Sequence, residues 1–214
     1  EVFDKISELE SWSPESINPK MVGRREGWWG STENFESFMD ELITWRELGY
    51  HTCVRRANYN QYSSLPEWAI KTLHEHSSDE REHIYSLDEL TYSQTHDEIW
   101  NAAQNQLRTQ GVIQNYLRML WGKKILEWTP NPQIALSYMI TLNDRYSLDG
   151  RDPNSYSGVF WILGRYDRAW GPERSIFGKI RYMTSDSTAR KFNLKPYLEK
   201  WGNESLGVST SISK

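Results

Sequence analysis

The sequence predicts an all-α protein. Apolar residues recur at three- and four-residue steps along several stretches, and no stretch alternates apolar and polar residues as a half-buried strand would. Capping signals and a helix-ending glycine stand at the ends of these stretches. The chain has 214 residues, of which 37% are hydrophobic, and this is enough to build a buried core.

The predicted helices begin at the start of the chain. An amphipathic pattern starts at Val2, directly after a first residue that is not Met, so we expect a domain taken from a longer protein. Residues 35–48 repeat the helical spacing. Ser64 is expected to cap the next helix, because Glu67 stands three residues later as in a capping box.

Three longer helices are predicted in the middle of the chain. Thr95 and Glu98 form a second capping-box pattern, which starts a helix that Gly111 ends. A continuous helical pattern follows over residues 112–128, and another helix is expected over about residues 132–142.

The last part of the chain contains more turn residues. Asp-Gly and Asp-Pro pairs predict a loop at residues 149–154, and a short helix is expected at about 157–163. Residues 165–184 have no regular pattern. We predict one helical domain over residues 1–201 and a flexible C-terminal tail over residues 202–214.

Charge divides the sequence into two halves. Residues 1–100 hold nine basic and 20 acidic residues, whereas residues 101–214 hold 16 basic and nine acidic residues. A basic half that is rich in aromatic residues is what a polyanion-binding surface needs, although ordinary surface charge explains the composition equally well. All five His lie in the acidic half, which excludes a His-based active site in the other half.

Several classes of site are excluded or disfavoured. One cysteine, Cys53, excludes a disulfide framework, and we expect it to be a small buried residue. His74 and His76 point to opposite faces of most elements and are expected at the surface, so no metal site is predicted. No apolar run approaches the length of a membrane span, and we expect no membrane partner.

Three features could carry chemistry. Trp121 and Trp128 stand two helical turns apart, although core packing is the usual reason for such a stripe. Arg118, beside Trp121, needs a carboxylate if it is buried. The nearest downstream candidates are Asp144, Asp149 and Asp152. Glu41 and Trp45, four apart, could together bind a planar ring by a hydrogen bond and stacking.

Several longer strings, in this order, resemble the photolyase/cryptochrome family. They lie at residues 40–48, 100–104, 116–128, 142–154, 177–183 and 189–192. The match is most similar to the class II cyclobutane pyrimidine dimer photolyases, and more to a bacterial branch of them. It extends from about Phe35 to Trp201.

The resemblance implies a helical FAD-binding domain that repairs DNA with light. Reduced FAD would give an electron to a pyrimidine dimer that is flipped out of the duplex, and the dimer would split. The expected partner is DNA containing pyrimidine dimers, and the expected location is the bacterial cytoplasm, at the nucleoid when DNA is bound, as a monomer. The family's N-terminal domain, which would hold any antenna chromophore, is expected to be missing, so the activity of this fragment alone is left open.

The resemblance also implies a role for individual residues. Expected beside the flavin are Arg118, Asn143, Asp149, Arg151, Asp152 and Asn154. Among these, Arg118 and Asp149 would form an ion pair, and Asn143 would face flavin N5. The expected electron chain is Trp121, Trp100 and Trp128. Expected at the lesion are Glu41, Trp45, Asn115, Met119 and Trp161. Expected at DNA phosphates are Arg165, Arg168, Lys179 and Arg181.

Two other functions remain open at this stage. A cryptochrome-like blue-light receptor has the same fold without repair, and a Trp-rich helical module could bind nucleic acid without flavin. Glu41, Trp45 and Met119 favour repair. The lack of His in the basic half argues against the (6-4) photolyases, which rely on His in the lesion pocket.

Overall fold

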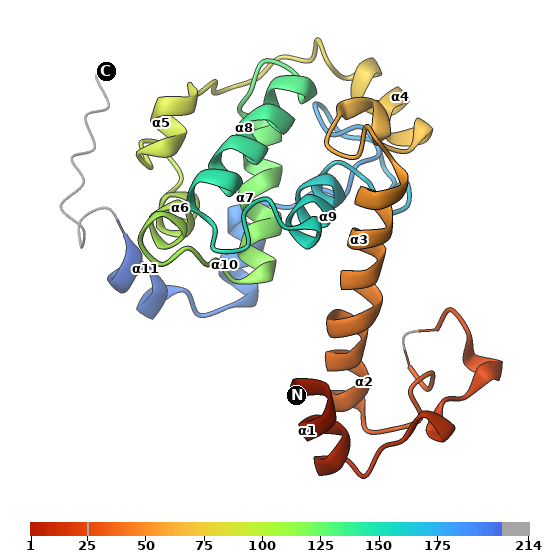
Figure 1. Cartoon of the computed structure of the whole chain (residues 1–214). Helices are drawn as coiled ribbons and strands as arrows, with labels where there is room; N and C mark the ends of the chain where they lie inside the picture. Colours follow the sequence, from red (N-terminus) through yellow and green to blue (C-terminus); the bar gives the residue numbers. More distant parts are fainter. Residues whose placement is uncertain (25, 203–214) are drawn as a thin grey trace. The chain divides into compact units, whose positions relative to one another are not determined.

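A computed structural model describes residues 1–24 and 26–202, and these residues form helices joined by loops (Figure 1). Within these ranges there is no β-strand, and an isolated antiparallel bridge joins Arg174 to Gly178. The prediction of an all-α fold is therefore confirmed. Residues 203–214 of the predicted tail lie outside the described residues.

Contacts within the chain define two compact units, Glu1–Arg55 and Arg56–Lys214. We refer to them as unit 1 and unit 2 and describe each by itself. The prediction of a single domain over residues 1–201 stays a prediction.

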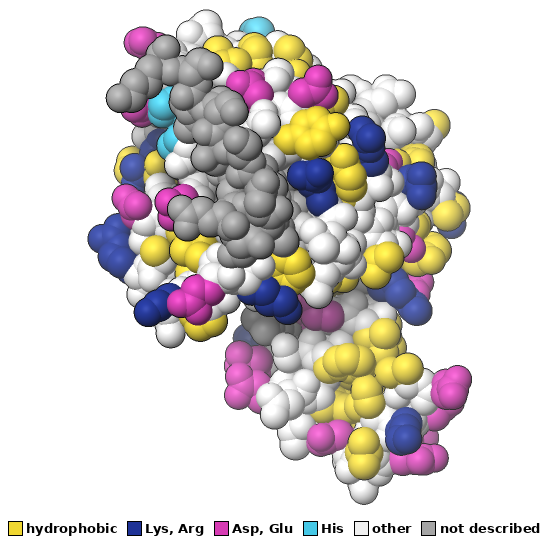
Figure 2. Space-filling view, turned by 90° about the vertical axis from the view of Figure 1, so that its left-hand side faces the viewer, with side chains coloured by type: hydrophobic (Ala, Val, Ile, Leu, Met, Phe, Trp, Pro, Cys, Tyr) yellow, Lys and Arg dark blue, Asp and Glu magenta, His cyan; other side chains and the backbone are white. Residues whose placement is uncertain are grey.

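Unit 1 is built around a small aromatic core. Its helical elements are α1 (Val2–Leu9), the 3₁₀ turns Pro14–Ser16 and Pro19–Met21, α2 (Glu33–Met39), a π-helical segment (Asp40–Trp45) and α3 (Arg46–Arg55). Its buried core side chains are Trp12, Trp29, Phe35 and Met39. The buried Glu36 carboxylate accepts backbone N–H bonds from Gly27 and Gly30, which ties the preceding loop to α2. Figure 2 shows hydrophobic side chains gathered on the visible face of this unit.

The helix predicted at residues 35–48 is longer and less regular than expected. It begins after Thr32, whose hydroxyl caps the helix by accepting from the Phe35 N–H, and it continues through α3 to Arg55. Between α2 and α3 the backbone widens into the π-helical segment. There the Trp45 indole donates to Asp40, five residues earlier, at 3.0 Å.

Unit 2 contains the main hydrophobic core. Its helices are α4 (Glu67–Glu75), α5 (Leu87–Thr91), α6 (Glu98–Gln110), α7 (Asn115–Glu127), α8 (Pro132–Tyr146), α9 (Pro153–Ile162), α10 (Ser185–Lys191) and α11 (Lys195–Trp201), with a 3₁₀ turn at Tyr62–Ser64. Helix α7 packs against α6, α8 and α9 (Figure 1). Gly122 permits the close approach of α9, because a Cβ there would lie 2.1 Å from the Ile162 side chain. The residues of α7 therefore stand at the centre of this unit.

Two predicted helix caps are wrong. Ser64 lies in a 3₁₀ turn, where its hydroxyl donates to the Gln61 carbonyl, and α4 begins only after Pro66. At α6 the cap is Asp97, which accepts from the Trp100 N–H at 3.0 Å, whereas Thr95 binds the Asn101 side chain. In both cases another group nearby, a backbone carbonyl for Ser64 and a side chain for Thr95, binds the hydroxyl that the local pattern assigned to the cap.

Other boundaries follow the sequence more closely. Gly111 ends α6 with a left-handed conformation of φ 73°, as its position predicted. Helix α8 continues four residues past the predicted end at residue 142, and α9 begins at Pro153, four residues before the predicted start. Helices α5, α10 and α11 were not predicted.

The minor predictions have mixed outcomes. Cys53 is half-buried rather than buried. His74 is exposed, and His76 is half-buried with its ring bonded to Asp79 at 2.7 Å. None of the helices in the described ranges is both long and apolar enough to cross a membrane.

Candidate functional site

An ion pair joins α7 to the α8–α9 loop. Arg118 Nη1 lies 3.1 Å from Asp149 Oδ2, and Nη2 lies 3.4 Å from Oδ1. Ser147 completes the cluster, since its hydroxyl binds the same carboxylate and also the Gly111 carbonyl. Of the three acids near Arg118 in the sequence, the structure selects Asp149. The predicted pairing of these two residues is confirmed.

The ion pair is accessible from one side. The Arg118 and Asp149 side chains are 17% and 40% exposed. Burial opposes ionisation of Asp149, but the hydrogen bonds from Ser147 and Arg118 and the charge of Arg118 outweigh it. The pKa of the Asp149 carboxyl therefore lies below its usual value, and the pair is charged at neutral pH.

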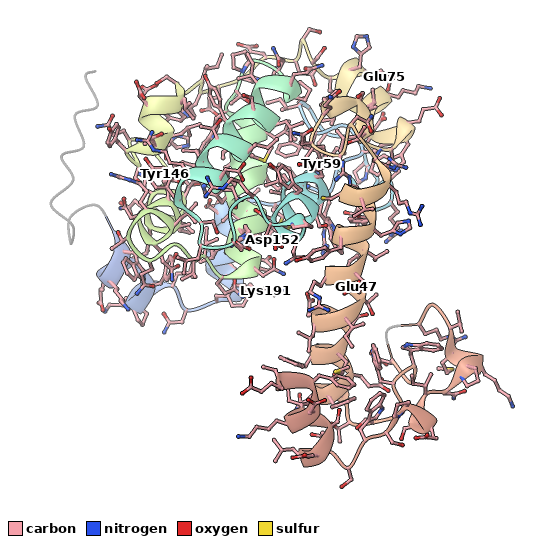
Figure 3. The ribbon with its side chains drawn as sticks, in the orientation of Figure 1. Glu47, Tyr59, Glu75, Tyr146, Asp152 and Lys191 are labelled. Atoms are coloured by element: carbon pink, nitrogen blue, oxygen red, sulfur yellow. The ribbon has the colours of Figure 1, made fainter. Side chains whose placement is uncertain are left out.

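The loop that carries Asp149 is tied to both adjoining helices. Asp144, in the last turns of α8, accepts from the Arg151 N–H at 3.0 Å and from the Tyr156 hydroxyl at 3.3 Å. Asp152 caps α9 by accepting from the Asn154 N–H at 2.8 Å. Figure 3 labels Tyr146 and Asp152, which bound this connection. Asp152 therefore has a structural role in shaping the loop, whatever else it contacts.

Asn143 lies one turn before the end of α8 and is 3% exposed. Its amide donates to the hydroxyl of Ser155 at the start of α9, which is also buried. The hydrogen bond fixes the orientation of the Asn143 carboxamide. Ser155 was not singled out from the sequence, although it directly follows the string at residues 142–154.

The three predicted electron-chain tryptophans lie together in the core. Trp100, Trp121 and Trp128 are each at most 2% exposed. The rings of Trp100 and Trp128 are 5.7 Å apart, edge to face. The Trp100 indole donates to the Trp121 carbonyl at 3.0 Å, and the Trp121 indole donates to Gln104 at 2.8 Å. The structure therefore brings the three residues together through α6 and α7.

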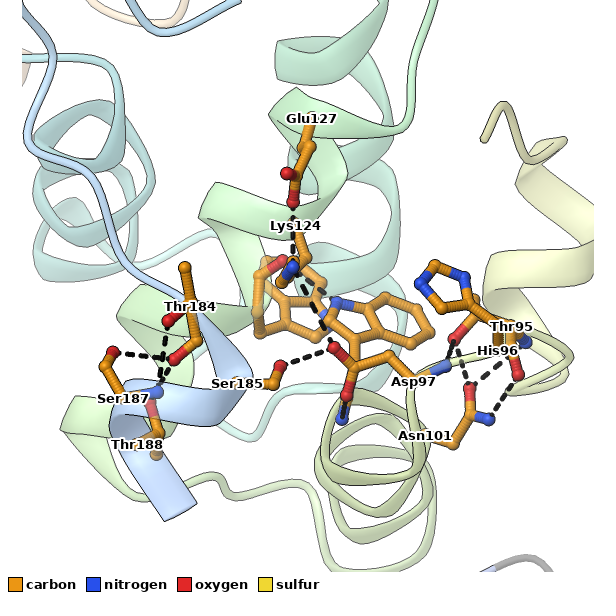
Figure 4. Close-up of polar contacts among 12 residues, drawn as sticks. Thr95, His96, Asp97, Asn101, Lys124, Glu127, Thr184, Ser185, Ser187 and Thr188 are labelled. Atoms are coloured by element: carbon orange, nitrogen blue, oxygen red, sulfur yellow. Dashed lines mark hydrogen bonds and ion pairs between the residues drawn. The ribbon is translucent and has the colours of Figure 1, made fainter. Parts of the chain in front are cut away.

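We call one group of charged side chains the charge cluster, and its three members are labelled in Figure 4. It consists of Asp97, Lys124 and Glu127. Lys124 Nζ is 2.8 Å from Glu127 and 4.0 Å from Asp97. It also lies 5.3 Å from the centre of the Trp128 ring. Sequence reasoning missed this cluster; the signal available was the spacing of Lys124 and Glu127, three apart on the helix face beside Trp128.

The predicted lesion residues fall into the two units. Glu41 and Trp45 lie in the π-helical segment of unit 1. In unit 2, Asn115 and Met119 are one turn apart on α7, with Arg118 beside them. Trp161, near the end of α9, packs edge to face against Tyr166 at 6.2 Å.

One of the four predicted phosphate contacts is wrong. Arg165 is only 5% exposed and uses its guanidinium inside unit 2, where it donates to the Tyr59 carbonyl and the Ser64 hydroxyl. Its other face covers the Phe160 ring at 3.8 Å. A buried arginine committed to these partners is not available to a DNA phosphate.

The other three basic residues are exposed. Arg168 and Arg181 lie 4.4 and 4.9 Å from the Trp170 ring. Lys179 forms an exposed ion pair with Glu173 at 3.4 Å. Their positive charges can meet a phosphate without a large desolvation cost. No group of three or more His, Cys, Asp or Glu side chains in the described residues could hold a metal ion.

Comparison with known proteins gives a consistent result. No family model matches the chain. The chain is 49% identical over 163 residues to the deoxyribodipyrimidine photo-lyase of Methanothermobacter thermautotrophicus, which covers 76% of this chain and 36% of that protein. It is 46% identical over 169 residues to the deoxyribodipyrimidine photo-lyase of Arabidopsis thaliana, covering 78% of this chain and 34% of that protein. The Potorous tridactylus protein of the same name is 45% identical over 169 residues, again 78% of this chain and 32% of its own length.

Over most of its length the chain is similar to curated proteins named deoxyribodipyrimidine photo-lyase. Nearly half of the aligned residues are identical, over three quarters of the chain. The chain spans about a third of the length of the curated photolyases it matches.

Proposed function

We propose that this chain is the FAD- and lesion-binding part of a class II-like photolyase that splits cyclobutane pyrimidine dimers in DNA with light. The observation that carries the proposal is the arrangement on α7. One helix holds Arg118, paired with Asp149, and also Trp121 and Trp128 of a buried tryptophan cluster. Similarity to proteins named deoxyribodipyrimidine photo-lyase supports the reaction.

The polar groups beside α7 fit a flavin. The edge of an isoalloxazine ring alternates hydrogen-bond donors and acceptors, and the Arg118–Asp149 pair presents both kinds at a half-exposed position. Asn143 adds a carboxamide, which can donate or accept. We assign Arg118, Asn143 and Asp149 to FAD, with Arg151, Asp152 and Asn154 shaping the loop beside it. FAD in its reduced form, when bound, supplies the light absorption and the electron that splits the dimer.

The side chains of unit 2 have distinct tasks in this proposal. The ion pair orients the cofactor, because a guanidinium held by a carboxylate keeps a fixed direction. The bond from Asn143 to Ser155 holds the carboxamide in one orientation. Trp121, Trp100 and Trp128 pass single electrons through a region from which water is excluded.

The remaining predicted residues are assigned to the DNA. Arg168, Lys179 and Arg181 contact phosphates, which fix the position of the duplex but do not read its sequence. Glu41, Trp45, Asn115, Met119 and Trp161 contact the flipped dimer. The π-helical backbone around Glu41 and Trp45 supports a role for them, because such segments occur often at functional sites.

The test is light-dependent repair. The 214-residue chain is loaded with FAD, the flavin is reduced, and an oligonucleotide with one thymine dimer is added; the recovery of thymine absorbance under blue light is compared with a dark control. We expect recovery only in light, and Glu41→Ala should lower the yield while duplex binding persists. A flavin-loaded chain that binds the oligonucleotide without repairing it would replace this proposal by a blue-light receptor.

A further inference from the structure

The environment of Trp128 differs from that of the other two tryptophans. The indole N–H groups of Trp100 and Trp121 donate to neutral oxygens inside the core. Within the described residues no lysine or arginine lies over either ring, whereas Lys124 lies 5.3 Å from the centre of the Trp128 ring. The cation of the charge cluster therefore lies over one tryptophan of the three.

Solvent screens this cluster weakly. The side chains of Asp97 and Lys124 are 8% and 11% exposed, and that of Glu127 is 24% exposed. Asp97 is also held by two further hydrogen bonds, since it caps α6 and accepts from the Ser185 hydroxyl of α10 (Figure 4). The charges are thus fixed in position near the ring, where their effect on it is stronger than at a water-exposed site.

We propose that the charge cluster sets how readily Trp128 gives up an electron. In this role Lys124 is a positioning residue that opposes oxidation, and Asp97 and Glu127 are positioning residues that favour it. The inference rests on the electron chain of the proposed function. It gives Asp97, Lys124 and Glu127 a task that electron transfer between the three tryptophans does not by itself require.

The step is the transfer of one electron from Trp128 to the radical cation of Trp100. Trp100 returns to its neutral form, Trp128 becomes the radical cation, and no proton moves. The oxidant at the start of the sequence is a photoexcited oxidised flavin. The positive charge that forms on the Trp128 ring is repelled by the Lys124 ammonium and attracted by the two carboxylates.

Four variants separate charge from structure. Lys124→Met removes the cation, Lys124→Arg keeps it, and Glu127→Gln removes one carboxylate at the same size. Lys200→Met is the matched control, because exposed Lys200 lies 4.8 Å over the ring of a different tryptophan, Trp201. Thermal unfolding of each variant reports any purely structural effect.

The first readout needs no flavin. The unloaded chain is oxidised with azide radicals from pulse radiolysis, and mass spectrometry gives the oxidation of Trp128 relative to Trp12, a 9% exposed residue of unit 1. We expect this ratio to rise about fivefold in Lys124→Met and to fall about threefold in Glu127→Gln. Lys124→Arg and Lys200→Met should stay within a factor of about two of the parent.

The second readout uses the FAD-loaded chain. After flash excitation of the oxidised flavin, the absorbance of the tryptophan radical is recorded over time. The lifetime of this radical should change among the variants in the same order as the oxidation ratio of the first readout. If the ratio of Trp128 to Trp12 oxidation is the same in all variants, the inference is overturned. A different outcome would separate the two proposals. If the ratios of Trp128 to Trp12 oxidation change as expected but the FAD-loaded protein forms no tryptophan radical, the effect of the charge cluster is supported. The electron transfer of the proposed function is then overturned.

Discussion

The two ends of α7 carry side chains in opposite environments. Near its start, the Arg118–Asp149 pair is half-exposed, with 40% of the Asp149 side chain accessible. From the middle of α7 to its C-terminal cap, Trp121 and Trp128 are each 2% exposed, and Lys123 between them is 3% exposed. A region that receives a ligand has to leave polar groups accessible, whereas a region that passes electrons needs only rings in contact. The following predictions test this difference.

The largest effect is expected at the buried end. Trp128→Phe removes the indole whose ring lies 5.7 Å from that of Trp100 and keeps an aromatic ring in the core. Photoreduction of oxidised flavin, followed by absorbance, should slow by about 100-fold, equivalent to about 3 kcal/mol in the barrier. Repair by chemically reduced enzyme should persist. Trp201→Phe, also at a buried position, is the control, and equal slowing in both variants would contradict the assignment.

A second effect at the buried end depends on pH. Burial lowers the pKa of Lys123 from 10.5 to about 7, and its ammonium site donates to the Ile162 carbonyl. Between these values the unfolded chain binds a proton that the folded chain does not, so stability should rise with pH by about 1 kcal/mol per unit from pH 7 to 9. Urea unfolding at each pH measures this slope. The slope should disappear in Lys123→Met, and a variant that keeps it would refute the prediction.

The smallest effect is expected at the exposed end, in the acid range. Asp149→Asn should lower the free energy of unfolding by about 1–2 kcal/mol at pH 7, because the pair is only partly shielded from water. The folded pKa of Asp149 lies below its ordinary value of 3.8, so this stabilisation is complete above about pH 4 and is lost as the pH falls further.

The free energies of unfolding of the parent and of Asp149→Asn should therefore converge toward pH 3. Asp186→Asn, at an exposed acid of α10, provides the control and should track the parent throughout. A difference between parent and Asp149→Asn that stayed constant with pH would show that the loss is not one of charge. The variant should also weaken FAD binding at neutral pH.

Local patterns predicted much of the fold. Gly111 ends α6 because its left-handed conformation suits glycine, and this signal needs no tertiary information. The caps at Ser64 and Thr95 were wrong because each hydroxyl has a better partner: Gln61 for Ser64, and Asn101 for Thr95. A sequence pattern shows which groups can cap, but it does not show which competitors will lie nearby.

In the candidate site, too, some features could be predicted from the sequence and others could not. The residues alone left three acids open for Arg118, the family resemblance selected Asp149, and the structure confirmed the pair. Arg165 was mistaken for a surface residue because its partners Tyr59 and Ser64 lie about 100 residues away in the sequence. The contact of Ser185 with Asp97 spans 88 residues and has no local signal.

The π-helical segment at Asp40–Trp45 sets the phase of everything that follows it in unit 1. A π turn holds one more residue than an α turn, so it has the geometry of a single inserted residue. Because the wide turn accommodates the extra residue, deleting one residue there would restore a regular helix and leave α3 close to its present rotation about its own axis. If all the residues were kept in a regular α-helix instead, every side chain from Arg46 to Arg55 would be rotated by about 100° relative to α2. The width of this short segment is therefore as much a part of the molecule's specification as the identity of its side chains.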